Sequence, residues 1–374
     1  MRVLNLPLLL WVMLHPVVVE AATFAVDTTS DNDTLTACTV APGDCSFRGA
    51  ALRAQNAALA PGDDLIQFAI PAATDPNCNA GSGVCTITLT GAMTVAMTTA
   101  TQGGLTIDGY SQPGASANTL AVPAGTNAQL RIEIAGSELT LQAPITLRGI
   151  AFGGPLTIER IGGFCCGTDP GSGRYEIEGN YFGLRADGLT PSAVPGILLH
   201  ISTSSGNVDG VRIGGELPAQ RNVFGSNGGS TTSTECLRLT GTHHQVHGNL
   251  IGTDRSGMLA LGCTTGILLQ GQAIDIGGSG SAQGNLFAGH HDRAISISGT
   301  QTAGTVKAVI QGNRFGVAVD GSTPLPIGTR NVNSNDLPMI RGDNTASVVR
   351  IGGSTPAAAN LFAHAGLGRP PLPS

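Results

Sequence analysis

The sequence predicts an all-β protein: a right-handed parallel β-helix of roughly ten to twelve coils with an N-terminal helical, disulfide-linked cap. One repeated phrase carries most of this prediction. It reads Ile213-Gly214-Gly215 with Asn222-Val223-Phe224 nine residues after Ile213, and it recurs from Ile276 and from Ile351, at distances of 63 and 75 residues. A constant internal offset with variable intervals is typical of a stacked repeat whose insertions lie in loops.

A second phrase, Gly-Asn-x-Ile/Phe-Gly, alternates with the first and begins at Gly179, Gly248 and Gly312. An asparagine at an inward bend can adopt the left-handed backbone conformation and hydrogen-bond the backbone of neighbouring coils. Stacked asparagines would then satisfy polar groups that are otherwise buried. The expected ladder comprises Asn180, Asn222, Asn249, Asn285, Asn313 and Asn360.

The segments between these phrases are short and alternate apolar with polar residues, as in Leu130–Ile134 and Ala294–Ile297. This period of two predicts strands, and the 54 Gly and 21 Pro keep them short. At about 22–27 residues per coil, a rod of roughly 50 Å is expected. The expected organisation is a signal peptide over 1–22, a cap over 23–85, the β-helix over 86–366 and a tail over 367–374.

Composition excludes several classes of protein. The chain has 12% charged residues, a net charge of −6 and a single lysine, Lys307. Without a basic stripe, nucleic acid is not an expected partner. A hydrophobic content of 41% is sufficient for a core, so a disordered chain is not expected either.

The N-terminus has the pattern of a secretory signal. Arg2 is followed by an apolar segment over 3–19, and Val19-Glu20-Ala21 places small residues where a signal peptidase cleaves. We expect cleavage after Ala21 or Ala22 and an extracellular, cell-surface or periplasmic location. A retained membrane anchor is the alternative, but the segment is short for a span, and an integral membrane protein is not expected.

Eight cysteines fit an oxidising compartment. Cys38/Cys45 and Cys78/Cys85 share one spacing, with six residues between, and are interpreted as local disulfides; Cys236/Cys263 lie about one coil apart and would bridge neighbouring coils. The adjacent Cys165-Cys166 pair stays unassigned. A zinc site is the rival interpretation, but these spacings exceed the usual two to four residues. No metal and no cofactor are expected.

The region before the repeats contains the best helix candidate, over 45–57, with Ser46 placed to cap it. Pro61-Gly62-Asp63-Asp64 is interpreted as the turn that ends it, and Leu65 begins a strand. A helix laid across the first coil would cover that coil's unpaired edge.

Cys45-Ser46-Phe47-Arg48, the segment 62–68 and Leu105–Gly109 resemble the N-terminal region of bacterial secreted CSLREA-domain proteins, although Gly49 stands where that family usually has Glu. The two repeated phrases are similar to those of right-handed parallel β-helix proteins of the pectin-lyase-like fold. The resemblance implies an extracellular or surface protein, assigned to adhesion or carbohydrate contact by analogy.

The same fold hosts polysaccharide lyases and glycoside hydrolases, which need clustered carboxylates or a calcium site. Asp63-Asp64 is the only adjacent acidic pair, and it is interpreted as a turn. Asp187, Asp254 and Asp320 follow the Gly-Asn phrases without a shared register, and a turn role is expected for them as well.

Histidines give the most suggestive clusters. His243-His244 and His247 precede Gly248, and His290, Asp292 and Arg293 combine a base, an acid and a cation. The last three are the candidate catalytic residues, yet alignment of the repeats places His290 at a turn. An exposed turn histidine is therefore the expected structural role.

The outward positions carry Ser, Thr, Asn and Gln, and several arginines that can pair with carboxylates. These are Arg131, Arg160, Arg174, Arg212, Arg238 and Arg314. The resulting hypothesis is a non-catalytic secreted or cell-surface rod, structural or adhesive, whose partner is an extracellular polysaccharide or a cell-surface component. The alternative is a polysaccharide lyase or glycoside hydrolase, and a surface without any ligand also stays open.

Overall fold

The computed structural model describes residues 21–56, 62–97, 102–142, 144–159, 175–192, 196–203, 208–226, 234–299, 304–329, 338–342 and 348–365. Most of the expected signal peptide lies outside these residues, as do Cys165, Cys166, Arg160 and Arg174.

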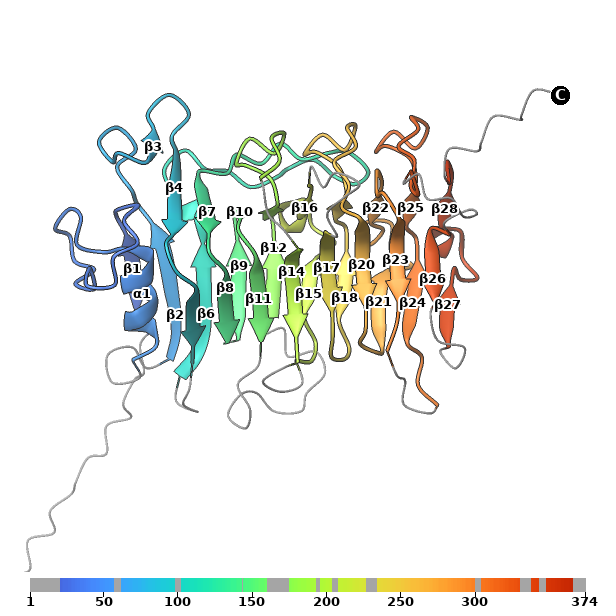
Figure 1. Cartoon of the computed structure of the whole chain (residues 1–374), viewed down its shortest axis with the longest axis horizontal. Helices are drawn as coiled ribbons and strands as arrows, with labels where there is room; N and C mark the ends of the chain where they lie inside the picture. Colours follow the sequence, from blue (N-terminus) through green and yellow to red (C-terminus); the bar gives the residue numbers. More distant parts are fainter. Residues whose placement is uncertain are drawn as a thin grey trace, which may run out of the picture.

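Three long sheets run along the molecule, an arrangement consistent with a β-helix solenoid (Figure 1). The first sheet contains β1 Thr23–Val26, β2 Gly62–Phe68, β6 Gln102–Asp108, β9 Ile145–Arg148, β12 Tyr175–Glu178, β15 Arg212–Gly214, β18 Gln245–His247, β21 Ile274–Gly277, β24 Ala308–Gln311 and β27 Val349–Ile351. The second contains β3 Cys78–Asn79, β4 Val84–Leu89, β7 Ile132–Gly136, β10 Ile150–Gly153, β13 Tyr181–Phe182, β16 Val223–Phe224, β19 Leu250–Ile251, β22 Leu286–Phe287, β25 Arg314–Phe315 and β28 Leu361–Phe362. The third contains β5 Met93–Ala96, β8 Leu139–Gln142, β11 Leu156–Glu159, β14 Ile197–Ser202, β17 Glu235–Leu239, β20 Thr265–Leu269, β23 Arg293–Ile297 and β26 Ile340–Gly342.

Among these strands the pairing is parallel, with the exception of the β3–β4 hairpin. Three short 3-10 helices, η1 Gly109–Ser111, η2 Pro218–Gln220 and η3 Pro356–Ala358, lie in the connections. The first strands of the first and second sheets, β1, β2 and β3, already lie within residues 23–85, whereas the third sheet begins with β5.

Within the described residues the first and second sheets each contain ten strands and the third contains eight, at or below the lower end of the predicted ten to twelve coils. From β9 onward, successive strands of the first sheet begin 29 to 41 residues apart. The assumed period of about 22–27 residues was too short, because the connections between strands carry insertions.

The interior is a column of stacked apolar side chains. Neighbouring phenylalanine rings of the second sheet stack with centroids 4.6 to 5.3 Å apart. Ile251 replaces a ring between Phe224 and Phe287. Each such ring pair adds about 0.5–1.5 kcal/mol beyond its buried area. The stacked residues are Phe152, Phe182, Phe224, Phe287, Phe315 and Phe362.

Beside this column the asparagines form a continuous ladder. Each backbone N–H donates to the Oδ1 of the next asparagine along the stack, for example Asn249 to Asn285 at 3.0 Å and Asn285 to Asn313 at 3.0 Å. Each Nδ2 donates to the carbonyl of a strand, as Asn249 does to Ile213 at 2.9 Å. The ladder runs from Asn180 to Asn360 without interruption.

The helix α1, Phe47–Ala54, begins as predicted, with the Ser46 hydroxyl accepting from the Gly49 N–H at 2.9 Å. It lies at the N-terminal end of the solenoid (Figure 1), where Phe47 packs 6.0 Å from Phe68. A Cβ at Gly49 would lie 1.9 Å from the carbonyl oxygen of Leu35. This close approach explains sterically why no larger residue stands at Gly49.

The turn interpretation of Asp63-Asp64 is wrong. Both residues lie in β2, where a register irregularity separates Gly62 from Asp64. Asp64 is 2% exposed, and its Oδ1 accepts from the Ala22 N–H at 3.1 Å. The first sheet begins earlier than the Pro-Gly pair suggested, because β1 supplies a partner strand for β2.

Three disulfides are present among the described residues: Cys38–Cys45, Cys78–Cys85 and Cys236–Cys263. The first two close short loops of the N-terminal region. The third joins neighbouring coils of the third sheet with a Cα–Cα distance of 5.6 Å, and both of its cysteines are fully buried.

Replacing both Cys236 and Cys263 with Ala is expected to lower the free energy of unfolding by about 3–4 kcal/mol, because the bond closes a long loop in the unfolded chain. The matched Cys78→Ala/Cys85→Ala variant should lose about 2 kcal/mol, since its loop is shorter. Urea unfolding without reductant measures both. A larger loss in the Cys78/Cys85 variant would contradict the expectation.

Candidate functional site

His290 lies inside the solenoid, so the expectation of an exposed turn histidine is wrong. An added Cβ at Gly252 or Gly266 would lie 2.7 Å from its ring. Burial lowers the pKa of His290 to about 4, although hydrogen bonding to the backbone at Cys263 and Ile251 opposes the shift. Asp292 and Arg293 are partly exposed. The three candidate catalytic residues therefore do not share one solvent-facing surface.

The histidines before Gly248 are also separated. His244 is fully buried, where its Nδ1 accepts from the Val211 N–H at 3.2 Å and its Nε2 lies 2.7 Å from the Thr240 carbonyl. This pair of contacts assigns the neutral Nε2–H tautomer, and burial lowers the pKa to about 4. His243 is exposed and contacts Asp209 at 2.8 Å.

No group of three His, Cys, Asp or Glu side chains placed to hold a metal ion occurs in the part of the chain that the structure describes. His247 is mostly buried, and burial lowers its pKa although the charge of Asp275 opposes the shift. The carboxylates of Asp187, Asp254 and Asp320 each accept backbone N–H groups of their own turns. They have the predicted turn role.

A polar pocket of about 630 Å³ lies on the outer face of the second sheet, between the β3–β4 hairpin and the turn after β13. Thr86 of β4 and Glu133 of β7 are partners in the strand register and line it. Arg131, Arg185 and Arg255 line it as well. The polar pocket thus combines hydroxyl, carboxylate and guanidinium groups from four separate stretches of chain.

Glu133 is held firmly in this pocket. Its Oε2 accepts from the Thr86 hydroxyl at 2.9 Å and from Arg185 Nη1 at 3.3 Å, and its Oε1 accepts from the Ala186 N–H at 2.7 Å. The residue is 7% exposed. A carboxylate that already accepts three hydrogen bonds is a fixed acceptor with limited capacity left for proton transfer.

Asp187 and Arg255 form the opposite side of the polar pocket. Burial acts to raise the pKa of Asp187, but hydrogen bonds from Thr190 and Leu189 and the charge of Arg255 outweigh it and lower the pKa. Asp187 therefore stays ionised at neutral pH and faces a guanidinium group.

Arg131 is oriented by its own contacts. Its Nε donates to the Gly114 carbonyl at 3.1 Å. The side chain passes two glycines in the left-handed conformation: an added Cβ would lie 3.8 Å from its Cδ at Gly83 and 3.5 Å from its Nε at Gly114. Among the described residues no acidic side chain forms an ion pair with Arg131.

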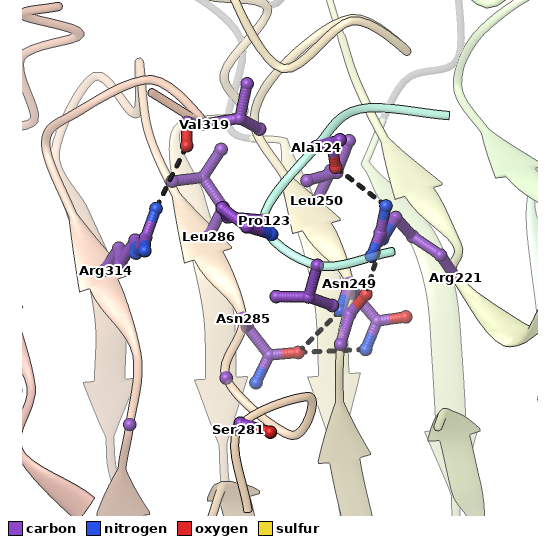
Figure 2. Close-up of a pocket in the computed structure, with 14 residues that line it drawn as sticks. Pro123, Ala124, Arg221, Asn249, Leu250, Ser281, Asn285, Leu286, Arg314 and Val319 are labelled. Carbon is purple, nitrogen blue, oxygen red and sulfur yellow. Dashed lines mark hydrogen bonds between the residues drawn. The ribbon is translucent and has the colours of Figure 1, made fainter. Parts of the chain in front are cut away.

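A second, smaller pocket of about 100 Å³ lies farther along the second sheet (Figure 2). Leu250 and Leu286 provide its apolar part, and Pro123 and Ala124 belong to the strap, residues 112–131, which runs outside the sheet (Figure 1). Arg221 donates to the carbonyls of Leu120, Ala124 and Gly125 at 3.2, 2.7 and 2.6 Å. The second pocket is thus formed where the strap is tied to the solenoid.

Arg221→Leu is expected to release the strap, because three strap carbonyls lose their donor. Burial lowers the pKa of Arg221 to about 10, so the native side chain is still a cation at neutral pH. Amide hydrogen exchange in 118–127 should accelerate by at least about tenfold, corresponding to a loss of about 1.4 kcal/mol. Arg350→Leu, on an exposed edge of the last coil, is the control, and equal protection in both variants would contradict the assignment.

The third sheet carries a further polar row, of which the sequence analysis named only Arg238. Thr157, His200 and Arg238 are register neighbours on β11, β14 and β17. Burial and the charge of Arg238 lower the pKa of His200, and Arg238 pairs with Glu235 at 2.7 Å. Neither of the two pockets described above includes this row.

These features define a sheet-rich protein of parallel strands with a polar pocket on its flank. No family model, no curated protein and no solved structure matches the chain. Within the described residues there is no helix long and apolar enough to cross a membrane.

The pocket residues were only partly recognisable in the sequence. Period-two alternation across 130–134 places Arg131 and Glu133 on the same outward face, and this signal was available. Arg185 and Arg255 belong to turns of later coils, and no local pattern connects them to Glu133.

Proposed function

We propose that the mature chain is a non-catalytic secreted or cell-surface rod that contacts carbohydrate through the polar pocket. The proposal includes the pectin-lyase-like right-handed β-helix and the CSLREA-type N-terminal region that the sequence resembles. It also includes export through residues 1–22, which the disulfides support because such bonds persist in oxidising compartments. In this proposal α1 closes the N-terminal end of the rod.

The observation that carries the proposal is the composition of the polar pocket. Its volume of about 630 Å³ falls in the range of small-ligand sites. Hydroxyl, amide and guanidinium groups surround it, and Glu133 is held as an acceptor by three hydrogen bonds. Sugars are recognised by such arrays of donors and acceptors. The chain's 4% aromatic content favours hydrogen bonding over ring stacking.

To test this proposal, the chain from Thr23 onward is assayed for binding and turnover of a panel of neutral and acidic polysaccharides. The assays are run with and without Ca²⁺. Binding without released product is expected. Ser82→Trp should abolish it, because Ser82 lines the polar pocket and an indole would fill the space. Ser354→Trp, at an exposed position of the last coil, is the matched control.

Release of product would refute the non-catalytic rod and identify the chain as a lyase or hydrolase. Binding that is unchanged in Ser82→Trp would move the contact to another surface. No binding to any member of the panel would reject carbohydrate as the partner.

A further inference from the structure

We propose that the polar pocket selects sugars that carry a carboxylate, such as uronates, and that Arg131 sets this preference. The inference rests on the proposed function and adds the chemical class of the ligand. It starts from a difference among the charged side chains that line the polar pocket. Among the described residues Arg185 and Arg255 face a carboxylate of the pocket, and Arg131 forms no ion pair.

The two carboxylates that line the pocket are occupied within the protein. Glu133 accepts from Thr86, Arg185 and Ala186, and Asp187 accepts from its own turn and faces Arg255. Their charges offset those of two of the three guanidinium groups. Arg131 remains as the surplus cation of the site.

The geometry of Arg131 suits recognition of a carboxylate. Its Nε is committed to the Gly114 carbonyl, so the guanidinium plane is fixed while both Nη groups are left to donate. A guanidinium with two parallel N–H donors binds a carboxylate in bidentate fashion, and a pre-oriented group loses less entropy on binding.

The net charge of the whole chain makes the positive charge of Arg131 important for binding an acidic sugar. The net charge is −6, so the surface as a whole repels a polyanion. For an acidic sugar, attraction to Arg131 would offset the repulsion from the rest of the surface. A neutral sugar would gain only hydrogen bonds. The preference for acidic sugars should therefore depend on one residue and weaken with salt.

Calorimetric titration with two matched pairs of oligosaccharides tests the inference: cello-oligomers against their C6-oxidised form, and galacturonate oligomers against their carboxyl-reduced form. Of the two carboxylated oligosaccharides, the one with the higher affinity should bind at least roughly tenfold more tightly than its neutral counterpart at low salt. Arg131→Gln should reduce this ratio to below about threefold, and Arg131→Lys, which keeps the charge but not the fork, to an intermediate value. Arg350→Gln should leave the ratio unchanged.

Equal affinity for both members of a pair would overturn the inference and leave the carbohydrate-binding rod standing. A preference that survives in Arg131→Gln would overturn it as well. Failure to bind either member of both pairs would overturn this inference and, together with a silent polysaccharide panel, the proposed function. Urea midpoints that match the wild type confirm that the Arg131 variants are folded.

Discussion

Acidification from pH 7 to pH 4 is expected to remove about 3 kcal/mol of stability for each of His244 and His290. Both side chains are fully buried, and burial lowers both pKa values from 6.5 to about 4. Between these two pH values the unfolded chain binds protons that the folded chain does not. The contribution of the two histidines to the free energy of unfolding is fully present above about pH 6.5 and is lost as the pH falls toward 4.

Substitution with leucine separates the two histidines. His290 is held mainly by packing, and its hydrogen bonding to the backbone at Cys263 and Ile251 does not offset the effect of burial on its pKa. His290→Leu should therefore cost less than about 1.5 kcal/mol at pH 7 and flatten the acid dependence. His244→Leu should cost at least about 2 kcal/mol at every pH, because Val211 and Thr240 lose their partner.

Urea unfolding at pH 7, 5.5 and 4.5 measures both effects, with the exposed His243→Gln as control. An acid dependence in His290→Leu equal to that of the wild type would refute the role assigned to this residue.

Breaking the asparagine ladder at its centre should have the second large effect. Asn249→Ala is expected to lower the free energy of unfolding by about 3–5 kcal/mol, since buried groups on both sides lose their partners. The N–H of Asn222 loses its acceptor, and the carbonyls of Ile213 and His247 lose a donor.

The same substitution at the end of the ladder is the matched control. Asn360 is only partly buried, and its side chain bonds the Asn313 N–H and the Ile310 carbonyl, so Asn360→Ala should cost about 1 kcal/mol. Comparable losses at the two positions, measured by urea unfolding, would show that the ladder does not act through burial.

The repeat, the ladder and the helix start were predictable because each depends on residues close in sequence. The fixed offset between Ile213 and Asn222 spans one bend and its two strands, and Ser46 bonds Gly49 within one helical turn. Cys236 and Cys263 were recognisable as partners because one coil separates them.

The length of one coil, the burial of His290 and the strand position of Asp64 were predicted wrongly for a common reason. Connections between strands vary in length, so counting along the chain does not give the position of a residue around the solenoid. A residue placed at a turn by alignment can therefore face the interior.

By itself, the sequence determined that this protein is built from stacked short strands with an asparagine ladder, because inward residues repeat in a local pattern. Only the tertiary structure decided where outward side chains meet. Glu133 and Arg185 are 52 residues apart and touch because two coils of different length place them on one flank. The polar pocket follows from that stacking and has no signature in any single segment. The same holds for Arg131, which forms no ion pair with the acidic side chains that the structure describes.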